Sequence, residues 1–204
     1  MKHAHGVERI VALCASLMLA GCVAHLHADL PEQTSFPTAA SVGKGTALTL
    51  VKPADARKQR ELIGVLKDEQ GSVGHEVRAN EDPVVWVGNS FSAGLKQAGF
   101  NVEQVNSLAD ASTPIAVTIT VNDIFSEFVP SGLSFDGRGS VNVVVQVYDK
   151  GQEVAKRTYS GTYTEHRFPS SSADYQAIID GAMKDMLARA IPNLARLINR
   201  TKAG

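Results

Sequence analysis

The chain of 204 residues has little cysteine, and no apolar run in it reaches the about 20 residues that a membrane-spanning helix needs. Its two cysteines, Cys14 and Cys22, both lie near the N-terminus. A disulfide framework and a cysteine-ligated zinc site are therefore excluded for the rest of the chain, and core packing must supply the stability. Basic and acidic residues are nearly balanced, at 20 and 21. A nucleic-acid-binding protein would need a basic face, so we expect no nucleic-acid partner.

The first residues have the pattern of a secretory signal. A start containing Lys2 and Arg9 precedes a short apolar run over residues 10–18, and small residues follow it. These three features are typical of a secretory signal peptide rather than of a membrane span. The alternative is an ordinary signal peptide followed by an incidental cysteine.

The end of this signal resembles the bacterial lipobox, in the sequence Leu19-Ala20-Gly21-Cys22. The resemblance implies that residues 1–21 are removed and that Cys22 is acylated, with a diacylglyceryl group and usually an amide-linked chain such as palmitate. One acyl chain anchors only marginally, but several together bind a membrane stably. Val23 follows the cysteine, where an aspartate would resemble an inner-membrane retention signal. By the sorting rule of that class, we expect the periplasmic face of the outer membrane.

Composition divides the mature chain into a tether and one domain. Removing residues 1–21 takes away Lys2, Arg9 and Glu8, which leaves 18 basic and 20 acidic side chains. Residues 22–45 contain Pro, Gly, Ser and Thr without apolar periodicity, which predicts a lipidated, flexible tether. Residues 46–204 then form a single domain.

Local patterns predict most of the elements of this domain. Asp82 before Pro83 is a good helix start, and Gly99 provides the stop. The alternation of residues 115–121 slips in phase near Asp123, which predicts a β-bulge. Residues 149–151 are typical of a tight hairpin turn. The remaining strands are expected at residues 46–51, 60–66, 100–105, 141–147 and 153–165, and residues 68–82 as a loop or irregular hairpin.

A long apolar stripe beginning near Ser171 predicts a closing helix, which Pro192 should kink or restart. Two amphipathic helices and several half-buried strands favour an α+β sandwich. We expect a mostly antiparallel sheet with both helices packed on one face. The other sheet face, which includes Thr118, Thr120 and Asn142, is the default surface for a partner.

No catalytic constellation stands out, and we expect neither an enzyme nor a cofactor or metal. The segment from Gly88 to Ser92 resembles a nucleophile elbow but has serine where the second glycine is required. His166 could act as a general base with Asp123 and Glu127, but a solvated strand end is the favoured interpretation.

Three residues are candidate partner contacts. Leu133 and Phe135 lie in the glycine-rich segment 129–140, which we predict to be a long loop, and long loops in compact domains are often functional. The alternative is that both side chains fold back over the sheet. Trp86 could anchor a partner, or it could be a residue at the boundary of the core.

The lipobox and the order of elements resemble the YajG-type lipoproteins of Gram-negative bacteria. The resemblance rests on Asp55-Ala56-Arg57, Ile63-Gly64, Gln97-Ala98-Gly99-Phe100 and Tyr159-Ser160-Gly161, together with the closing helix. It implies no reaction. It favours a non-enzymatic outer-membrane lipoprotein, a binding or accessory module for an envelope protein or peptidoglycan. The alternatives are an auxiliary lipoprotein of envelope lipid or lipopolysaccharide transport, which would need an apolar groove open to solvent, and a hydrolase, which would need a polar cleft.

Overall fold

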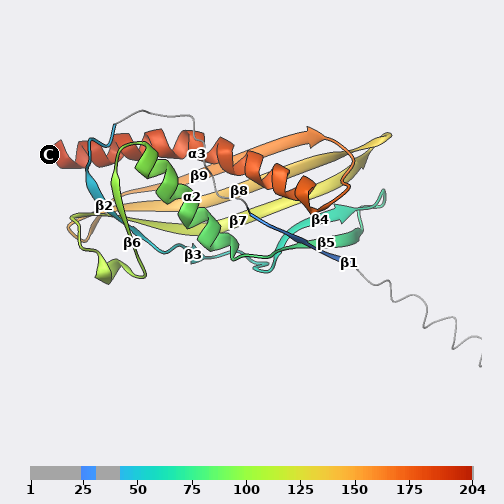
Figure 1. Cartoon of the computed structure of the whole chain (residues 1–204), viewed down its shortest axis with the longest axis horizontal. Helices are drawn as coiled ribbons and strands as arrows, with labels where there is room; N and C mark the ends of the chain where they lie inside the picture. The colour runs from blue at the N-terminus through green and yellow to red at the C-terminus, as the bar shows by residue number, and fades with distance from the viewer. Residues whose placement is uncertain (1–23, 31–41, 204) are drawn as a thin grey trace, which may run out of the picture.

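A computed structural model describes residues 24–30 and 42–203 of the chain (Figure 1). The predicted signal peptide and the lipobox residues Leu19, Ala20, Gly21 and Cys22 lie outside the described residues. The elements are β1 (Ala24–Ala28), β2 (Ala47–Val51), β3 (Ala54–Asp55), β4 (Leu62–Lys67), β5 (Val73–Ala79), α2 (Pro83–Gln97), β6 (Asn101–Val105), η2 (Leu108–Asp110), β7 (Ile115–Ser131), β8 (Ser134–Asp149), β9 (Gln152–His166) and α3 (Ser172–Ala203).

The described strands form one mixed sheet organised around β7. This strand pairs with β8 along one side and with β2, β3 and β4 in succession along the other. Five of the eight pairings in the described part of the chain are parallel, whereas β4–β5, β7–β8 and β8–β9 are antiparallel. The expectation of a mostly antiparallel sheet is therefore wrong.

Pairing direction was missed because alternation reports burial and not direction. The segment Leu48-Thr49-Leu50-Val51 of β2 is buried at every residue. Such a continuously buried strand is typical of parallel pairing, where both faces are covered. β2 pairs in parallel with β6, and α2 lies in the long connection between them.

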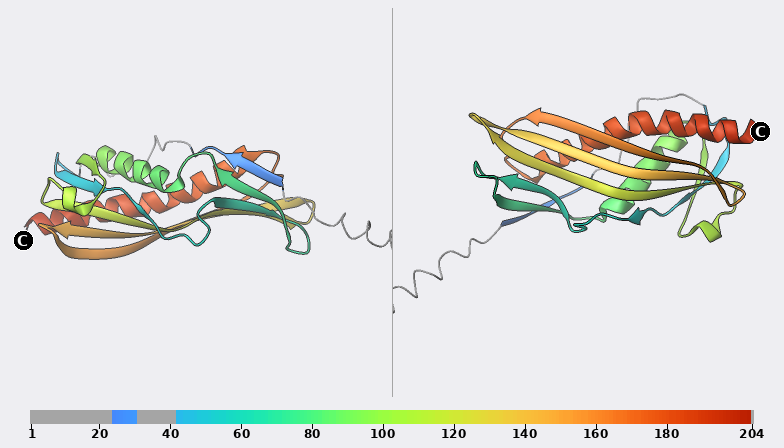
Figure 2. Two further views of the ribbon diagram at one scale, coloured as in Figure 1. Left: turned by 90° about the horizontal axis from the view of Figure 1, so that it is seen from below. Right: turned by 180° about the vertical axis from the view of Figure 1, so that it is seen from behind.

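Both helices lie on the same face of the sheet (Figure 2, left). α3 runs along β7, β8 and β9, and α2 packs beside it over β6. Between the helices and the sheet lies one apolar core, which includes Phe91, Val117, Phe128, Ile179 and Met186. The opposite face of β7, β8 and β9 is left uncovered (Figure 2, right). No helix among the described residues is long and apolar enough to cross a membrane.

α3 packs so closely on β8 and β9 that glycine is required beneath it. A Cβ at Gly139 would lie 2.6 Å from the carbonyl oxygen of Ile178, and a Cβ at Gly161 would clash with the carbonyl oxygen of Ala182. The helix also covers the free edge of β9, where Asp185 accepts a hydrogen bond from the Thr162 N–H and Arg189 donates to the Ser160 carbonyl. Covering an edge strand in this way protects it from pairing with other chains.

The local predictions with a clear chemical signal are confirmed. The Asp82 carboxylate accepts a hydrogen bond from the Val84 N–H at 2.9 Å and caps α2. The register of β7 and β8 shifts between Val121 and Asp123, where the bulge was expected. Lys150 and Gly151 form the β8–β9 turn, both with positive φ.

Two local predictions are wrong. Residues 129–140 are not a long loop, because β7 continues to Ser131 and β8 begins at Ser134. Their glycines misled the prediction, since Gly137 makes room mainly for the Phe128 ring and Gly139 for α3, and neither forms a loop. Residues 24–28 are a strand paired with β5, so the flexible tether does not extend over them. α3 is one continuous helix through Pro192, so the helix does not restart there, and the expected kink stays a prediction.

Candidate functional site

Three apolar side chains gather at one end of the sheet, and we call Leu133, Phe135 and Phe168 the apolar tip. Leu133, in the β7–β8 turn, is 95% exposed, and Phe168, after β9, is 64% exposed. Phe135 is half-buried, packs against the core, and meets the Phe168 ring edge-on with centroids 5.7 Å apart. Large apolar side chains this exposed and this close together form a patch of the kind that marks contact sites.

A shallow hollow of about 570 Å³ lies beside the apolar tip. Leu66, His75 and Pro130 line it together with the three residues of the tip. The hollow is therefore formed where the ends of β4 and β7 meet the start of β5.

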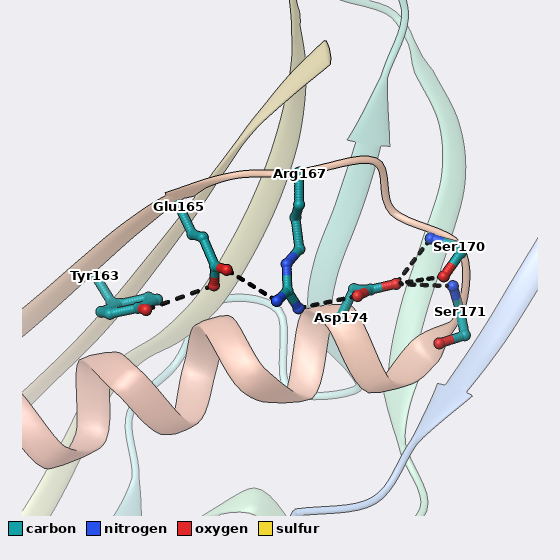
Figure 3. A network of polar contacts seen from close by, with 6 residues as sticks. All are labelled: Tyr163, Glu165, Arg167, Ser170, Ser171 and Asp174. Carbon is teal, nitrogen blue, oxygen red and sulfur yellow. Dashed lines mark hydrogen bonds and ion pairs between the residues drawn. The ribbon is translucent and has the colours of Figure 1, made fainter.

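An ion-pair network holds the segment that bears Phe168 (Figure 3). The Arg167 guanidinium lies between two carboxylates, 2.8 Å from Glu165 and 3.0 Å from Asp174. Its backbone N–H donates to the Phe135 carbonyl at 3.0 Å. Asp174 in turn accepts hydrogen bonds from the backbone N–H groups of Ser170 and Ser171. Phe168 therefore lies between Arg167 and Ser170, which these contacts hold in place, and the backbone fixes its side chain in an exposed position.

The same network lowers the pKa of the Asp174 carboxyl. Burial by itself would raise the pKa of this carboxyl, but the N–H groups of Ser170 and Ser171 and the charge of Arg167 outweigh burial and hold the pKa below its ordinary value. The carboxylate also sits in the first turn of α3, where it faces the positive end of the helix dipole.

The residues around His166 do not converge on a cleft. The His166 side chain is 72% exposed and its Nδ1 lies 2.6 Å from Asp136. Asp123 is bonded to Ser140, and Glu127 pairs with Lys67. The three proposed members of a general-base site thus have separate partners. Among residues 24–30 and 42–203, no group of three or more His, Cys, Asp or Glu side chains is placed to hold a metal ion.

The uncovered sheet face has a row of hydrogen-bonded polar side chains across its three long strands. Asn122, Asn142 and Ser160 lie side by side on β7, β8 and β9, linked by side-chain hydrogen bonds of 3.0 and 2.6 Å. Thr118 lies opposite Gln146, and Thr120 lies one row further along β7. The expected location of these side chains on the face away from the helices is confirmed, and most of them are uncharged.

The predicted contact residues are separated by the fold. Leu133 and Phe135 come together at the tip, whereas Trp86 is only 3% exposed and packs in the core from α2. Trp86 therefore offers no surface to a partner, which agrees with the alternative of a core position. Phe168 was missed. Its sequence signal is a lone aromatic residue followed by Pro169 and three serines, a polar setting in which an apolar side chain has no core to enter.

Comparison with known proteins gives a family and a fold. The model of a family described as uncharacterized lipoprotein matches residues 34–193. The match supports the lipoprotein part of the resemblance found in the sequence, and the narrower YajG-type assignment stays a prediction. No curated protein matches the chain.

The structure is similar to that of protein XCC0632 from Xanthomonas campestris, of the DUF330 family. The two share 14% identity with a TM-score of 0.63, over 87% of this chain and 99% of that one. At this identity the likeness shows a shared fold alone. Weaker likenesses are lipoprotein GNA1162 from Neisseria meningitidis (12% identity, TM-score 0.38, 78% of this chain and 100% of that one) and CT253 from Chlamydia trachomatis (11%, 0.45, 78% and 99%). These two support no argument.

Proposed function

This chain belongs to the uncharacterized lipoprotein family, and on that premise we propose that it is a non-enzymatic binding module of the Gram-negative envelope. Acylated Cys22 attaches it to the periplasmic face of the outer membrane. The domain presents a surface to an envelope protein or to peptidoglycan, and it performs no reaction of its own.

The observation that supports a binding role is the uncovered face of β7, β8 and β9. These strands have 17, 16 and 15 residues, which gives a long surface that no element of the described chain covers. Its rows of hydroxyl and amide groups, such as Asn122, Asn142 and Ser160, can donate and accept hydrogen bonds without the cost of stripping water from charges.

The placement of the charged groups favours binding over hydrolysis. Of the two carboxylates that the sequence grouped with His166, Asp123 bonds to Ser140 and Glu127 pairs with Lys67, while the imidazole itself contacts Asp136. Hydrolysis would need a nucleophile, a base and an oxyanion site within hydrogen-bond reach of one another.

An auxiliary role in envelope lipid transport is the second candidate, and the hollow beside the apolar tip favours it. The hollow is open to solvent, and its volume falls within the range of small-molecule sites. Leu66, Pro130 and Phe135 give it an apolar part, and charged residues at the β4–β5 turn such as Lys67 and Asp68 could hold a headgroup. Copurification of a stoichiometric phospholipid with the protein, lost in Leu66→Glu, would support this role over the first.

Attachment is tested by the mass of the protein purified from membranes. We expect a chain that begins at Cys22 and has the added mass of a diacylglyceryl group and an acyl chain, in outer-membrane fractions of a sucrose gradient. An unmodified Cys22, or a protein found in inner-membrane fractions, contradicts the corresponding part of the proposal.

The binding role is tested by photo-crosslinking in intact cells. A photoreactive amino acid at Thr158 or Ser160 lies on the uncovered face, and the same probe at Ala177 of α3 is an exposed control. We expect discrete adducts to one protein, or to peptidoglycan, from the first two positions only. Adducts equally abundant from Ala177, or absent from the sheet face, would place the partner surface elsewhere or remove the binding role.

A further inference from the structure

We propose that the apolar tip inserts into the lipid bilayer to which Cys22 is anchored. The domain is then oriented with its β7–β8 turn against the membrane. The inference rests on the proposed lipidation of Cys22 and adds to it an orientation and a second, protein-borne membrane contact. Three features of the molecule carry it: strand register, the length of chain before β1, and the chemistry of the tip.

The register of the strands places the start of β1 at the same end of the sheet as the tip. Ala24 lies beside His75 of β5, His75 lies opposite Leu66 of β4, and Leu66 lies beside Phe128 of β7. β1 runs opposite in direction to β7, because of the three pairings only β5–β4 is antiparallel. The chain before Ala24 and the chain after Phe128 therefore leave this row toward the same side.

The molecular shape agrees with this register. In Figure 1, β1 begins at the end of the molecule where the β7–β8 and β4–β5 turns project, and the C-terminus lies at the opposite end. Neighbouring strands are about 4.8 Å apart, so three steps separate β1 from β7 by about 14 Å.

The chain between the lipid and the sheet is too short to hold the domain away from the membrane. Cys22 precedes Ala24 by two residues, which span at most about 7 Å when fully extended. A folded partner domain has a diameter of roughly 30 Å, so it does not fit between this end of the sheet and the bilayer. The occupant of the patch at this end is therefore the membrane itself.

The tip has the chemistry of a surface that enters the headgroup layer. Residues 128–135 and 168–173 contain no charged side chain. Leu133 and Phe168 project from these two segments, and the Phe135–Phe168 contact joins them. Apolar side chains on an uncharged surface bury favourably at the boundary between headgroups and acyl chains.

Charged groups at this end flank the tip and limit how deeply it enters. Asp68 and Glu69 are exposed in the β4–β5 turn, where Asp68 accepts hydrogen bonds from the Gln70 and Ser72 N–H groups. Lys67, which lines the hollow beside the tip, pairs with Glu127. These groups belong at the hydrated level of the headgroups, which leaves Leu133 and Phe168 as the inserted side chains.

The test uses lipidated, full-length mature protein in vesicles of phosphatidylethanolamine and phosphatidylglycerol. Cys22 is acylated, so a cysteine introduced by Leu133→Cys reacts alone with an environment-sensitive fluorophore. Lys150→Cys is the matched control, because Lys150 occupies the other turn of β8, at the far end of the molecule. We expect the probe at position 133 to shift to the blue, to lose quenching by aqueous iodide and to gain quenching by a quencher on the acyl chains. The probe at position 150 should show none of these three changes.

Each outcome separates this inference from the proposed function. Iodide quenching of both probes on vesicle-bound, acylated protein overturns the inference and leaves the lipid anchor in place. A protein that does not bind vesicles and has an unmodified Cys22 overturns both. Protection of the probe at position 133 that disappears on dilution of the protein in the membrane overturns the inference in favour of contact between copies, and protection independent of dilution supports it.

Discussion

The two turns at the ends of strand β8 each reverse the chain in two residues, but they expose side chains of different chemistry. At one end, Gly132 with positive φ and Leu133 reverse the chain from β7, and at the other end Lys150 and Gly151 reverse it into β9. Both are two-residue hairpin loops, for which polar residues and glycine are the ordinary choice. Lys150 follows that rule, whereas Leu133 breaks it and stands 95% exposed.

This difference shows that the fold does not require an apolar side chain at position 133. A hairpin needs only the backbone angles that Gly132 supplies, and Leu133 adds almost no burial. The same end holds Phe168, fixed in an exposed position by Arg167 and Asp174. Local rules that are broken at one place without a gain in packing are expected at functional sites. The comparison therefore supports the proposed membrane contact at the end where β1 begins, with solvent at the other end.

The largest effect is expected on membrane association, from removing the lipid anchor at Cys22 that distinguishes the two ends. Cys22→Ala should abolish membrane association, because the insertion of two side chains at the tip binds far more weakly than several acyl chains. Fractionation at high salt measures the loss, and unchanged far-ultraviolet circular dichroism shows that the domain still folds. Retention of the variant in outer membranes would mean that lipidation is not the main anchor.

The second-largest effect is expected on the stability of the domain, from substitutions in α3, which packs on the strands that carry both turns. Ile179→Asp and Met186→Asp each put an unpaired charge on a fully buried face of α3 and should lower the free energy of unfolding by more than about 4 kcal/mol. Lys184→Asp is the control, since that side chain is half exposed and pairs with Asp180 at the surface of the helix. Chemical denaturation compares them, and equal midpoints for all three would show that α3 does not pack on the sheet.

A smaller effect should loosen only the end with the apolar tip. Asp174→Asn weakens the cap and the pair with Arg167, and we expect a loss of about 1 kcal/mol. Because the folded-state pKa of Asp174 is lowered, its stabilisation is fully present above the unfolded-state value near 3.8 and is lost as the pH falls through the lower folded value. Melting temperatures between pH 7 and pH 2 should converge for the two proteins at the acidic end. A constant difference over this range would contradict the role of the carboxylate.

The smallest effects compare the two turns directly. Leu133→Ser and Lys150→Ser should each change stability by less than about 0.5 kcal/mol, because both side chains are exposed. Adding Phe135→Ser to Leu133→Ser should cost about 1–3 kcal/mol, since Phe135 packs against Phe168 and the core. Thermal unfolding measures both. A large loss from Leu133→Ser alone would mean that this side chain belongs to the core after all.

Much of the fold could be predicted because its signals are local. The Asp82 cap, the bulge near Asp123, the turn at Lys150 and the stripe of α3 each depend on neighbouring residues. Pairing direction could not be predicted, because β2, β4 and β6 find partners far away in the chain. Gly137 and Gly139 suggested a loop, since sequence cannot distinguish a glycine in a turn from one beneath a helix.

The site could be predicted only in part. Leu133 and Phe135 were singled out as apolar residues among glycines, but the reason they meet Phe168 lies in two long-range contacts, the ring pair and the Arg167 N–H bond to the Phe135 carbonyl. For Trp86 the alternative of a core position is confirmed, because α2 turns this side chain into the core. That Ala24 joins the sheet so soon after Cys22 depends on pairing with β5, which nothing near it in sequence indicates.

Our account holds that one turn of β8 contacts the membrane and the other faces solvent. The most direct test is how fast a cysteine placed in each turn reacts with a thiol reagent in intact cells. Leu133→Cys and Lys150→Cys variants are treated with a hydrophilic maleimide that enters the periplasm, and the rate of labelling is followed with time. The account predicts that position 150 reacts rapidly, that position 133 is protected, and that Cys22→Ala in the same chain removes the protection. Equal, rapid labelling of both positions in the anchored protein would contradict it.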